Sequence, residues 1–299
     1  MIKLYGIKST IKADIIGLTK GLQKHGDELI ITNDPADTAN ADCFIQTNLI
    51  KPKFFTKESN KGHLYQFILD SGKPYLVNES PSFRQYPGWR RLGWYSYKWT
   101  DGVFGNENSP SDRWNKFEAA TGIQFRDWHS PGDAIVIMGQ KEGDSSLIEL
   151  YKTYDSFYDW VQTVIVLLRE YTDRPIIIRA HPRNRDRGIK LATELQNKLK
   201  DVKVSDCEDI FDDLSRAYCV ITYNSLSAIE SITAGIPTFA LNDGSMIWPV
   251  AHRDLKQIEN LSYDIDLTQW KYDIAYTQWT SREHKTGESW EHLKPLVFK

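Results

Sequence analysis

The chain of 299 residues has few cysteines and no long apolar segment. Its three cysteines, Cys43, Cys207 and Cys219, are far apart and lack the spacing of metal ligands. This pattern argues against zinc and favours buried thiols in a reducing compartment. No apolar run approaches the ~18 residues that a membrane-spanning helix needs, and the first residues show no apolar signal segment. We therefore expect a cytoplasmic protein with no metal and no membrane partner.

The chain also lacks a large net charge, which is −3 at pH 7. The molecule as a whole would not attract nucleic acid, so any contact with a polyanion requires a local basic patch. Aromatic residues, in contrast, are abundant, with 10 Trp, 15 Tyr and 12 Phe. A single core rarely supports a chain of this length, and about 150 residues per domain predicts two domains.

Apolar strands alternate with amphipathic helices, an order typical of an α/β fold with parallel sheets. In the first half the pattern predicts strands at 2–7, 28–32, 41–47 and 74–78, and helices at 13–25 and 62–71. In the second half it predicts strands at 134–141, 175–179, 202–205, 218–222 and 236–241, and helices at 156–171, 189–199 and 209–216. The expected domains are two Rossmann-like units, 1–130 and 131–260, followed by a helical tail, 261–299, that packs back on the body.

The strand that begins at residue 175 ends in a basic and polar turn. Pro182 keeps His181 extended at the strand tip, and Arg179 and His181 are two residues apart, which places them on the same side of a strand. Ligands bind at the carboxyl ends of strands in open α/β sheets. The stretch therefore predicts an anion site; a basic turn that is merely solvated is the alternative.

A second polar tip follows the strand 218–222. Asn224 or Ser225 at a helix N-cap would leave the backbone N–H groups of residues 227–230 pointing outward, where they could bind phosphate. The alternative is an ordinary cap without a ligand. Two polar tips in one sheet, one basic and one at a helix N-terminus, favour a nucleotide site; Gln140 and Lys141 lie at the matching tip of the first strand of that domain and are candidate donor-binding residues without a sharp motif.

Residues 82–117 form an aromatic and basic segment that we interpret as a long loop. Aromatic faces stack on bases or sugars, and Arg and Lys neutralise phosphates, so the segment is a candidate acceptor site. The alternative is a subdomain core built from Trp. The candidate acceptor-binding residues are Arg84, Arg90, Arg91, Trp94, Tyr95, Lys98, Trp99 and Arg113.

A transferase that acts on a hydroxyl needs a carboxylate as general base. Asp101 is the first candidate and Glu79, at the end of the strand 74–78, is the second. An aromatic setting would raise the pKa of such a group towards the value that suits a base. For either residue, a cap or an ion pair is the structural alternative.

Residues 134–241 resemble part of the GT-B glycosyltransferases. Arg179-Ala180-His181-Pro182, the segment 224–230 and Gly235-Ile236-Pro237 are similar to the His-Pro and Ser-rich motifs of capsule-type and sialyltransferase-like enzymes. The resemblance implies two Rossmann-like domains that face each other across a cleft, and a nucleotide diphosphate sugar donor, with a UDP-sugar as first choice. It implies that His181, Ser225 and Ser227 bind donor phosphate and that Glu230 binds ribose or sugar hydroxyls; Arg179 would stabilise the leaving diphosphate.

The first half departs from the capsule enzymes, because their acidic-Gly motif has only a weak counterpart in Asp101-Gly102. The chain length and the aromatic, basic segment resemble phage enzymes that glycosylate hydroxymethylpyrimidines in DNA. This implies sugar transfer to hydroxymethylcytosine in DNA, with the base flipped out, in the host cytoplasm if the protein is phage-encoded. The alternatives are a capsular or cell-surface glycan acceptor, a nucleotide-sugar epimerase, and a non-catalytic binding protein.

Overall fold

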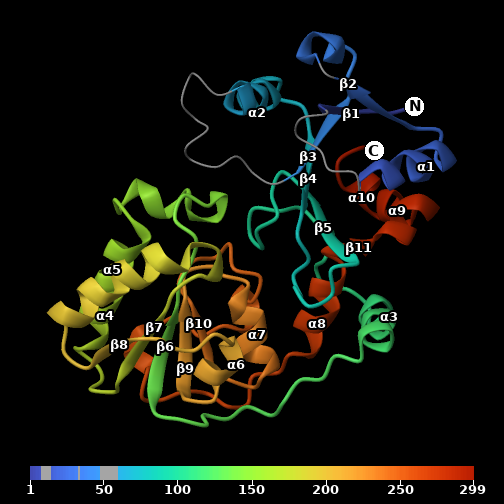
Figure 1. The fold of residues 1–299 in the computed structure, drawn as a ribbon. Helices are drawn as coiled ribbons and strands as arrows, with labels where there is room; N and C mark the ends of the chain where they lie inside the picture. Colours follow the sequence, from blue (N-terminus) through green and yellow to red (C-terminus); the bar gives the residue numbers. More distant parts are fainter. Residues whose placement is uncertain (8–14, 33, 48–59) are drawn as a thin grey trace. The chain divides into compact units, whose positions relative to one another are not determined.

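The computed structural model describes residues 1–7, 15–32, 34–47 and 60–299. The chain divides into two units, each built around its own β-sheet (Figure 1). Unit 1 comprises Met1–Thr121 together with Thr268–Lys299, and unit 2 comprises Gly122–Leu267. The C-terminal segment is therefore part of unit 1, to whose sheet it contributes a strand. Across the described ranges, no helix combines the length and apolarity that crossing a membrane requires.

The sheet of unit 1 has six strands in the order β11-β5-β4-β3-β1-β2. Its strands are β1 (Lys3–Ile7), β2 (Glu28–Thr32), β3 (Cys43–Thr47), β4 (Tyr75–Glu79), β5 (Trp89–Trp94) and β11 (Gln278–Thr280). The first four are parallel, whereas β5 is antiparallel to β4 and β11 is antiparallel to β5. The helices are α1 (Ile16–Lys24), α2 (Asn60–Asp70), α3 (Asp112–Thr121), α8 (Thr268–Ala275), α9 (Ser281–Thr286) and α10 (Glu288–Leu293). The predicted start of the first helix, Ala13, lies outside the described residues.

The aromatic and basic segment 82–117 is not a long loop, because it contains β5 and the first half of α3. Most of its large rings are core. Phe83, Trp94 and Phe117 are at most 1% exposed, and the Phe83 and Phe117 ring centroids lie 4.9 Å apart. The alternative interpretation, a core built from aromatic side chains, therefore describes this segment, since rings with this much apolar area stabilise a fold most when they are buried.

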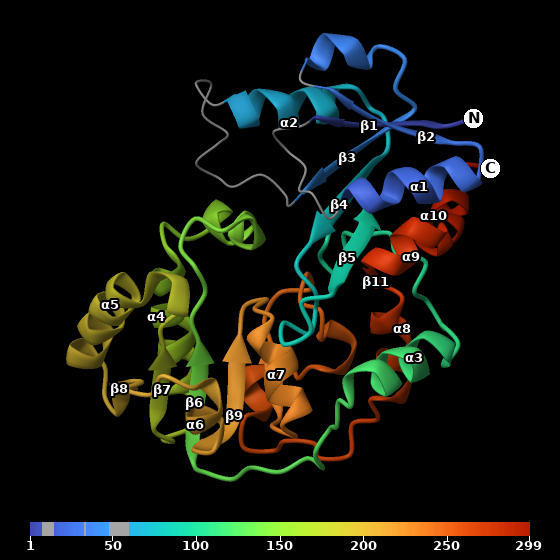
Figure 2. The ribbon, with the colours of Figure 1, turned by 45° about the vertical axis from the view of Figure 1, so that its right-hand side comes forward.

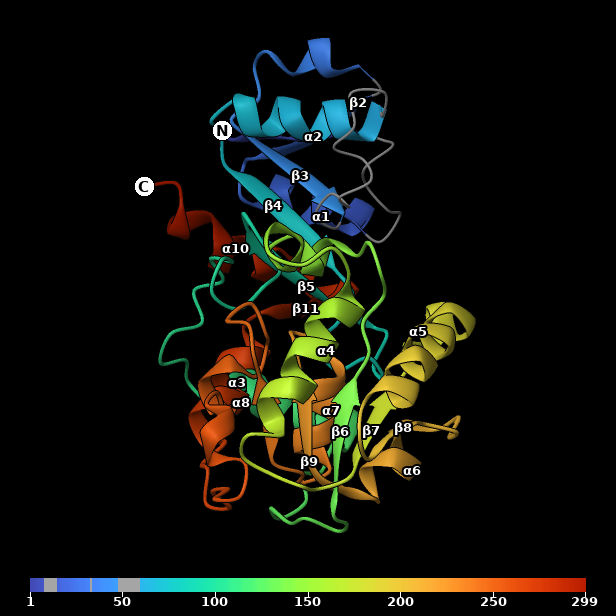
Figure 3. The same cartoon turned by 90° about the vertical axis from the view of Figure 1, so that its left-hand side faces the viewer.

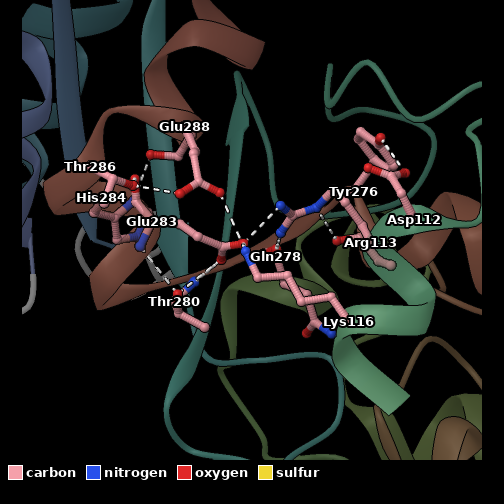
Figure 4. A network of polar contacts seen from close by, with 12 residues as sticks. Asp112, Arg113, Lys116, Tyr276, Gln278, Thr280, Glu283, His284, Thr286 and Glu288 are labelled. Carbon is pink, nitrogen blue, oxygen red and sulfur yellow. Dashed lines mark hydrogen bonds and ion pairs between the residues drawn. The ribbon is translucent and has the colours of Figure 1, made fainter. Parts of the chain in front are cut away.

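Hydrogen bonds to two buried carboxylates, Glu283 and Asp27, hold the C-terminal segment against the rest of unit 1. Glu283, at the start of α9, accepts hydrogen bonds from Arg113 Nη1 at 2.9 Å and Lys116 Nζ at 2.8 Å, both from α3 (Figure 4). Asp27 accepts from Trp290 Nε1 at 2.8 Å and Lys294 Nζ at 2.7 Å. Burial alone would raise the pKa of Glu283, but the charge of Arg113 and the hydrogen bonds from Lys116 and the Thr280 N–H lower this pKa to about 2.

The sheet of unit 2 has five parallel strands in the order β10-β9-β6-β7-β8. Its elements are β6 (Ala134–Met138), α4 (Phe157–Leu168), β7 (Ile176–Arg179), α5 (Arg185–Lys198), β8 (Val202–Val204), α6 (Ile210–Leu214), β9 (Ala217–Thr222), α7 (Ser227–Thr233) and β10 (Thr238–Ala240). The chain thus moves from the central β6 to β7 and β8 on one side, and then crosses to β9 and β10 on the other. Strand order reverses between β6 and β9, which makes this the topological switch point of the sheet.

Both faces of this sheet are covered by helices (Figures 2 and 3). Ile135 and Ile137 pack into a core that includes residues of α4 and α5, while Val136 and Met138 pack with Leu214 of α6. This explains why β6 is an uninterrupted apolar run and not an alternating one, as expected for a strand buried on both faces. The strands predicted in this half are confirmed, with ends that shift by up to three residues; β5 and β11 of unit 1 are the strands that the sequence pattern missed.

We expect acid to destabilise unit 1 as Glu283 takes up a proton. Because the folded pKa is about 2 against an ordinary 4.5, this stabilisation is complete above about pH 4.5 and is lost as the pH falls towards 2. Glu283→Gln should lower the free energy of unfolding at pH 7 by about 3 kcal/mol and reduce its pH dependence below pH 4.5. Urea unfolding at pH 7 and pH 3, followed by Trp fluorescence, measures both quantities.

The matched control is Glu288→Gln. Glu288 lies 3.3 Å from the same Lys116, but its side chain is 46% exposed, so its loss should cost less than about 1 kcal/mol. An identical pH dependence of stability in Glu283→Gln and the unsubstituted chain would contradict the expectation.

Candidate functional site

Two amide side chains span the switch point of unit 2. Gln140 follows β6 and Asn224 follows β9, and they share two hydrogen bonds. Gln140 Nε2 donates to Asn224 Oδ1 at 2.8 Å, and the Asn224 N–H donates to Gln140 Oε1 at 3.0 Å. Both residues are buried. The two connections that diverge at the switch point are thereby held in one arrangement at the carboxyl edge of the sheet, the edge where the parallel strands end.

The amide network extends to a second residue of the connection after β6, Ser146, and to one further connection, which follows β10. Asn224 Nδ2 donates to the Ser146 carbonyl at 2.9 Å and to Asn242 Oδ1 at 2.8 Å, and Asn242 Oδ1 also accepts from the Gly244 N–H at 3.2 Å. Sequence reasoning missed Ser146 and Asn242. Asn242 could have been found, because it follows the predicted strand 236–241 as Asn224 follows 218–222. Asn224 thus connects three loops at one edge.

Ser225 and Ser227 lie beside this network in the turn that leads into α7. Ser227 Oγ donates to Ser225 Oγ at 2.8 Å, and each residue is 9% exposed. The expectation of outward backbone N–H groups is wrong for the start of this helix. Leu226 is the N-cap, and the N–H groups of Ser227, Ala228 and Ile229 donate to Ser225 Oγ, the Ser225 carbonyl and the Leu226 carbonyl. The two hydroxyls, and not the helix amides, are the polar groups that this turn offers.

His181 lies at the tip of β7 in the extended conformation predicted for a residue before proline, with φ −69° and ψ 131°. Its Nδ1 accepts a hydrogen bond from the Arg183 N–H at 3.1 Å. In the neutral ring the proton is therefore on Nε2, which makes that nitrogen a hydrogen-bond donor. The imidazole is half-buried, and Lys141 and Glu230 are also half-buried, after β6 and in α7 respectively.

Arg179 does not point its charge at a ligand, which corrects its predicted role. Its guanidinium forms a salt bridge with the fully buried Asp213 of α6 and donates to the carbonyls of Cys207, Glu208 and Asp209. Ser205 Oγ donates to the same carboxylate at 2.7 Å. A buried carboxylate needs such partners because it has lost its hydration. Arg179 therefore fastens the end of β7 to the 205–213 segment.

The two candidate bases lie at opposite edges of the unit 1 sheet. In the antiparallel β4–β5 pair, Leu76 pairs with Trp94 and Glu79 with Arg91. Glu79 is therefore at the carboxyl edge of the parallel strands, whereas Asp101, which follows β5, belongs to the amino edge, on the order of 10 Å away along the strands. Asp101 also forms an ion pair with Lys98 at 3.4 Å and is 55% exposed. Because ligands bind at carboxyl edges, the fold favours Glu79.

Known structures resemble the whole chain, although no family model matches it and no curated protein matches it in sequence. A KpsC β-Kdo 2,7 transferase of Thermosulfurimonas dismutans aligns with a TM-score of 0.56 at 14% identity, over 96% of this chain and 98% of that one. A KpsC β-Kdo 2,4 transferase of the same organism aligns with a TM-score of 0.55 at 15% identity, over 92% and 91%. The chain has the GT-B fold.

Within this GT-B chain, several predicted acceptor residues are used by the fold itself. Trp94 is fully buried, with its Nε1 donating to the Leu293 carbonyl at 2.8 Å, so it has no face on which a base or sugar could stack. Arg91 donates to the Ser80 and Tyr97 carbonyls at 2.8 and 3.0 Å. Arg113 holds Glu283 and stacks over Trp279, 3.6 Å from the ring centroid. These three assignments are corrected.

The other predicted acceptor residues separate into two groups. Tyr95, Lys98 and Trp99 all follow β5; Tyr95 donates its N–H to the Tyr75 carbonyl at the amino edge, and Lys98 is buried in its pair with Asp101. Arg84 lies between β4 and β5 and Arg90 is the second residue of β5, on the side of the sheet where Glu79 ends β4; they are exposed and half-buried respectively. Among the residues that the structure describes, no three His, Cys, Asp or Glu side chains are grouped to hold a metal ion.

Replacement of Arg179 should test its corrected role in this GT-B chain. Arg179→Ala leaves Asp213 buried without its cation, so we expect the free energy of unfolding to fall by about 3–5 kcal/mol. Arg183→Ala is the control, because Arg183 is exposed at the same strand tip and its loss should cost less than about 0.5 kcal/mol. Urea unfolding measures both. Unchanged stability together with weakened nucleotide binding would restore the ligand role.

Proposed function

We propose that the protein is a glycosyltransferase whose nucleotide-sugar donor binds at the carboxyl edge of unit 2. The observation that carries this proposal is the hydrogen-bonded pair Gln140–Asn224 across the switch point, where open α/β sheets bind ligands. The GT-B fold supports it, as does the similarity to the two Kdo transferases. A UDP-sugar is the first donor to test.

The groups around this pair suit a donor diphosphate. The Ser225 hydroxyl and the Nε2–H of His181 are donors that phosphate oxygens accept, and Ser227 orients the Ser225 hydroxyl by donating to its oxygen. Lys141 follows Gln140 after β6, and Glu230 lies in α7. Since Arg179 is committed to Asp213, the leaving diphosphate would be stabilised by neutral donors together with Lys141. Donors held in place before the reaction are effective, because they need no reorganisation as charge develops.

Glu79 is the proposed general base. In the reaction, an acceptor hydroxyl oxygen forms a bond to the anomeric carbon, the bond from that carbon to the diphosphate breaks, and Glu79 takes the hydroxyl proton. Asp101 is the alternative base, and its ion pair with Lys98 at the other edge of the sheet counts against it.

Hydroxymethylcytosine in DNA is one candidate acceptor, and a cell-surface glycan is the other. The exposed Arg84 and half-buried Arg90 could contact DNA phosphates, but Trp94 and most other large rings of the segment 82–117 are core, whereas Tyr95 is exposed and Trp99 half-buried. The two similar structures are Kdo transferases. We therefore favour the glycan.

We expect mass spectrometry to detect sugar transfer when the protein is incubated with a panel of nucleotide sugars and both acceptors. One acceptor is a Kdo-terminated oligosaccharide and the other is a duplex that contains 5-hydroxymethylcytosine.

Asn224→Ala should weaken donor binding at least tenfold in calorimetry, because Gln140 and Asn242 each lose a hydrogen-bond partner. Asn197→Ala, at an exposed position of α5, is the control and should bind normally. If the unsubstituted protein binds no nucleotide sugar, the proposal is wrong.

Glu79→Gln should lower kcat about 10²- to 10³-fold and leave donor affinity unchanged, because the amide cannot take a proton. Asp101→Asn is the paired variant and should keep nearly full turnover. Steady-state kinetics with the active donor and acceptor separate the two. If Asp101→Asn loses turnover and Glu79→Gln does not, the base assignment is reversed.

A further inference from the structure

A row of polar side chains crosses one face of the unit 1 sheet at its carboxyl edge. Gln46 of β3 pairs with Val77, and Glu79 lies two residues after Val77 on β4. Glu79 pairs with Arg91 of β5, which pairs in turn with Gln278 of β11. Paired residues and residues two apart share a face. Gln46, Glu79, Arg91 and Gln278, hereafter the polar row, therefore lie on the same side of four adjacent strands.

The polar row is unusually buried for side chains of this kind. Gln46 and Arg91 are each 4% exposed and Gln278 is 0% exposed, while Glu79 is half-buried. Gln278 Oε1 accepts a hydrogen bond from the Ser82 N–H at 3.2 Å, which places the loop after β4 against the row. Ser82 is 1% exposed. The loop after β4 thus lies against Gln278, at one end of the row.

Three polar atoms of this region have no hydrogen-bond partner in the described part of the chain. They are Gln46 Nε2, Gln278 Nε2 and Ser82 Oγ. Buried polar groups in folded proteins are nearly always paired, because an unmade hydrogen bond costs stability. Apolar side chains of similar size would fill the same space at a lower cost. Two amide donors and a hydroxyl beside Glu79 therefore indicate a ligand with oxygen atoms.

The charges of the row decide which ligand fits. Its single cation, Arg91, donates from Nε and Nη1 to the carbonyls of Ser80 and Tyr97. The unpartnered donors of the row are therefore neutral, and its one carboxylate, Glu79, accepts from the Ser80 N–H through Oε1 at 2.6 Å. A hydroxyl group both accepts from an amide N–H and donates to a carboxylate, whereas an ionised phosphate oxygen has no proton to donate to Glu79 and is repelled by its charge. The row is matched to hydroxyl groups.

We propose that the polar row, together with Ser82, binds the hydroxyl groups of a carbohydrate acceptor beside Glu79. This inference rests on the proposed transferase function and gives its acceptor a chemical class. Gln46 and Gln278 donate to the acceptor oxygens and thereby position it, and Glu79 takes the proton of the hydroxyl that attacks. Gln278 connects the site to the C-terminal segment, since β11 belongs to it (Figure 4).

Gln46→Met tests the proposal with two measurements, the thermal stability of the protein and its KM for the acceptor. The substitution keeps the volume and removes the unpartnered donor, so the midpoint of thermal unfolding should stay the same or rise. The KM for a Kdo-terminated oligosaccharide should rise about tenfold, with kcat and donor affinity unchanged. Ser82→Ala should behave in the same way. Gln66→Met, at an exposed position of α2 where the amide donates to Asp70, is the control and should change neither quantity.

The outcomes separate this inference from the function on which it rests. An unchanged KM in both Gln46→Met and Ser82→Ala overturns the role of the row, as does failure of the oligosaccharide to accept sugar. Transfer to hydroxymethylcytosine DNA alone overturns the carbohydrate acceptor and leaves the transferase standing. Absence of donor binding in the unsubstituted chain is instead a failure of the proposed function.

Discussion

Strand direction is the constraint on which both candidate sites depend. In unit 2 all five strands run parallel, so the residues that follow β6, β7, β9 and β10 meet at one edge. Gln140 and Asn224 hydrogen-bond there across the switch point. In unit 1 the reversed β5 separates residues that are close in sequence. Glu79 and the start of the next loop stay at the carboxyl edge, while Tyr95, directly after β5, is carried to the other, where its N–H donates to the Tyr75 carbonyl.

Two of the cations that the sequence predicts to bind a ligand are paired with buried carboxylates instead. Arg179 pairs with Asp213, and Arg113 pairs with Glu283. Both carboxylates are at most 1% exposed. Once buried, a carboxylate must be compensated by charge and hydrogen bonds, and an arginine supplies both from a planar group. What is left for ligands in both units is therefore dominated by amides, hydroxyls and one imidazole.

This chemistry favours recognition by shape and hydrogen bonding over attraction of charge. The amide network of unit 2 is satisfied internally and positions its loops, whereas the polar row of unit 1 contains donors without partners among the described residues. A paired network holds its geometry before a ligand arrives, whereas unpaired donors increase the affinity for a ligand that accepts their hydrogen bonds. The two units thus present different kinds of polar edge.

The sequence by itself determined the α/β class, most strands, and the polar tips at Gln140, His181 and Asn224. Apolar runs followed by polar turns are local signals, and β6, β7 and β9 of unit 2 each carry one. It also identified Glu79 as a candidate without being able to rank it above Asp101. Only the tertiary structure decided that Arg179, Arg91 and Arg113 serve the fold and that the rings of 82–117 are mostly core. Only the tertiary structure also shows that Gln278 and Glu79 pair with the same residue of β5, Arg91, from its two sides. Burial and ion pairing depend on partners that are distant in the chain, and neither composition nor local pattern shows which distant residues a side chain contacts.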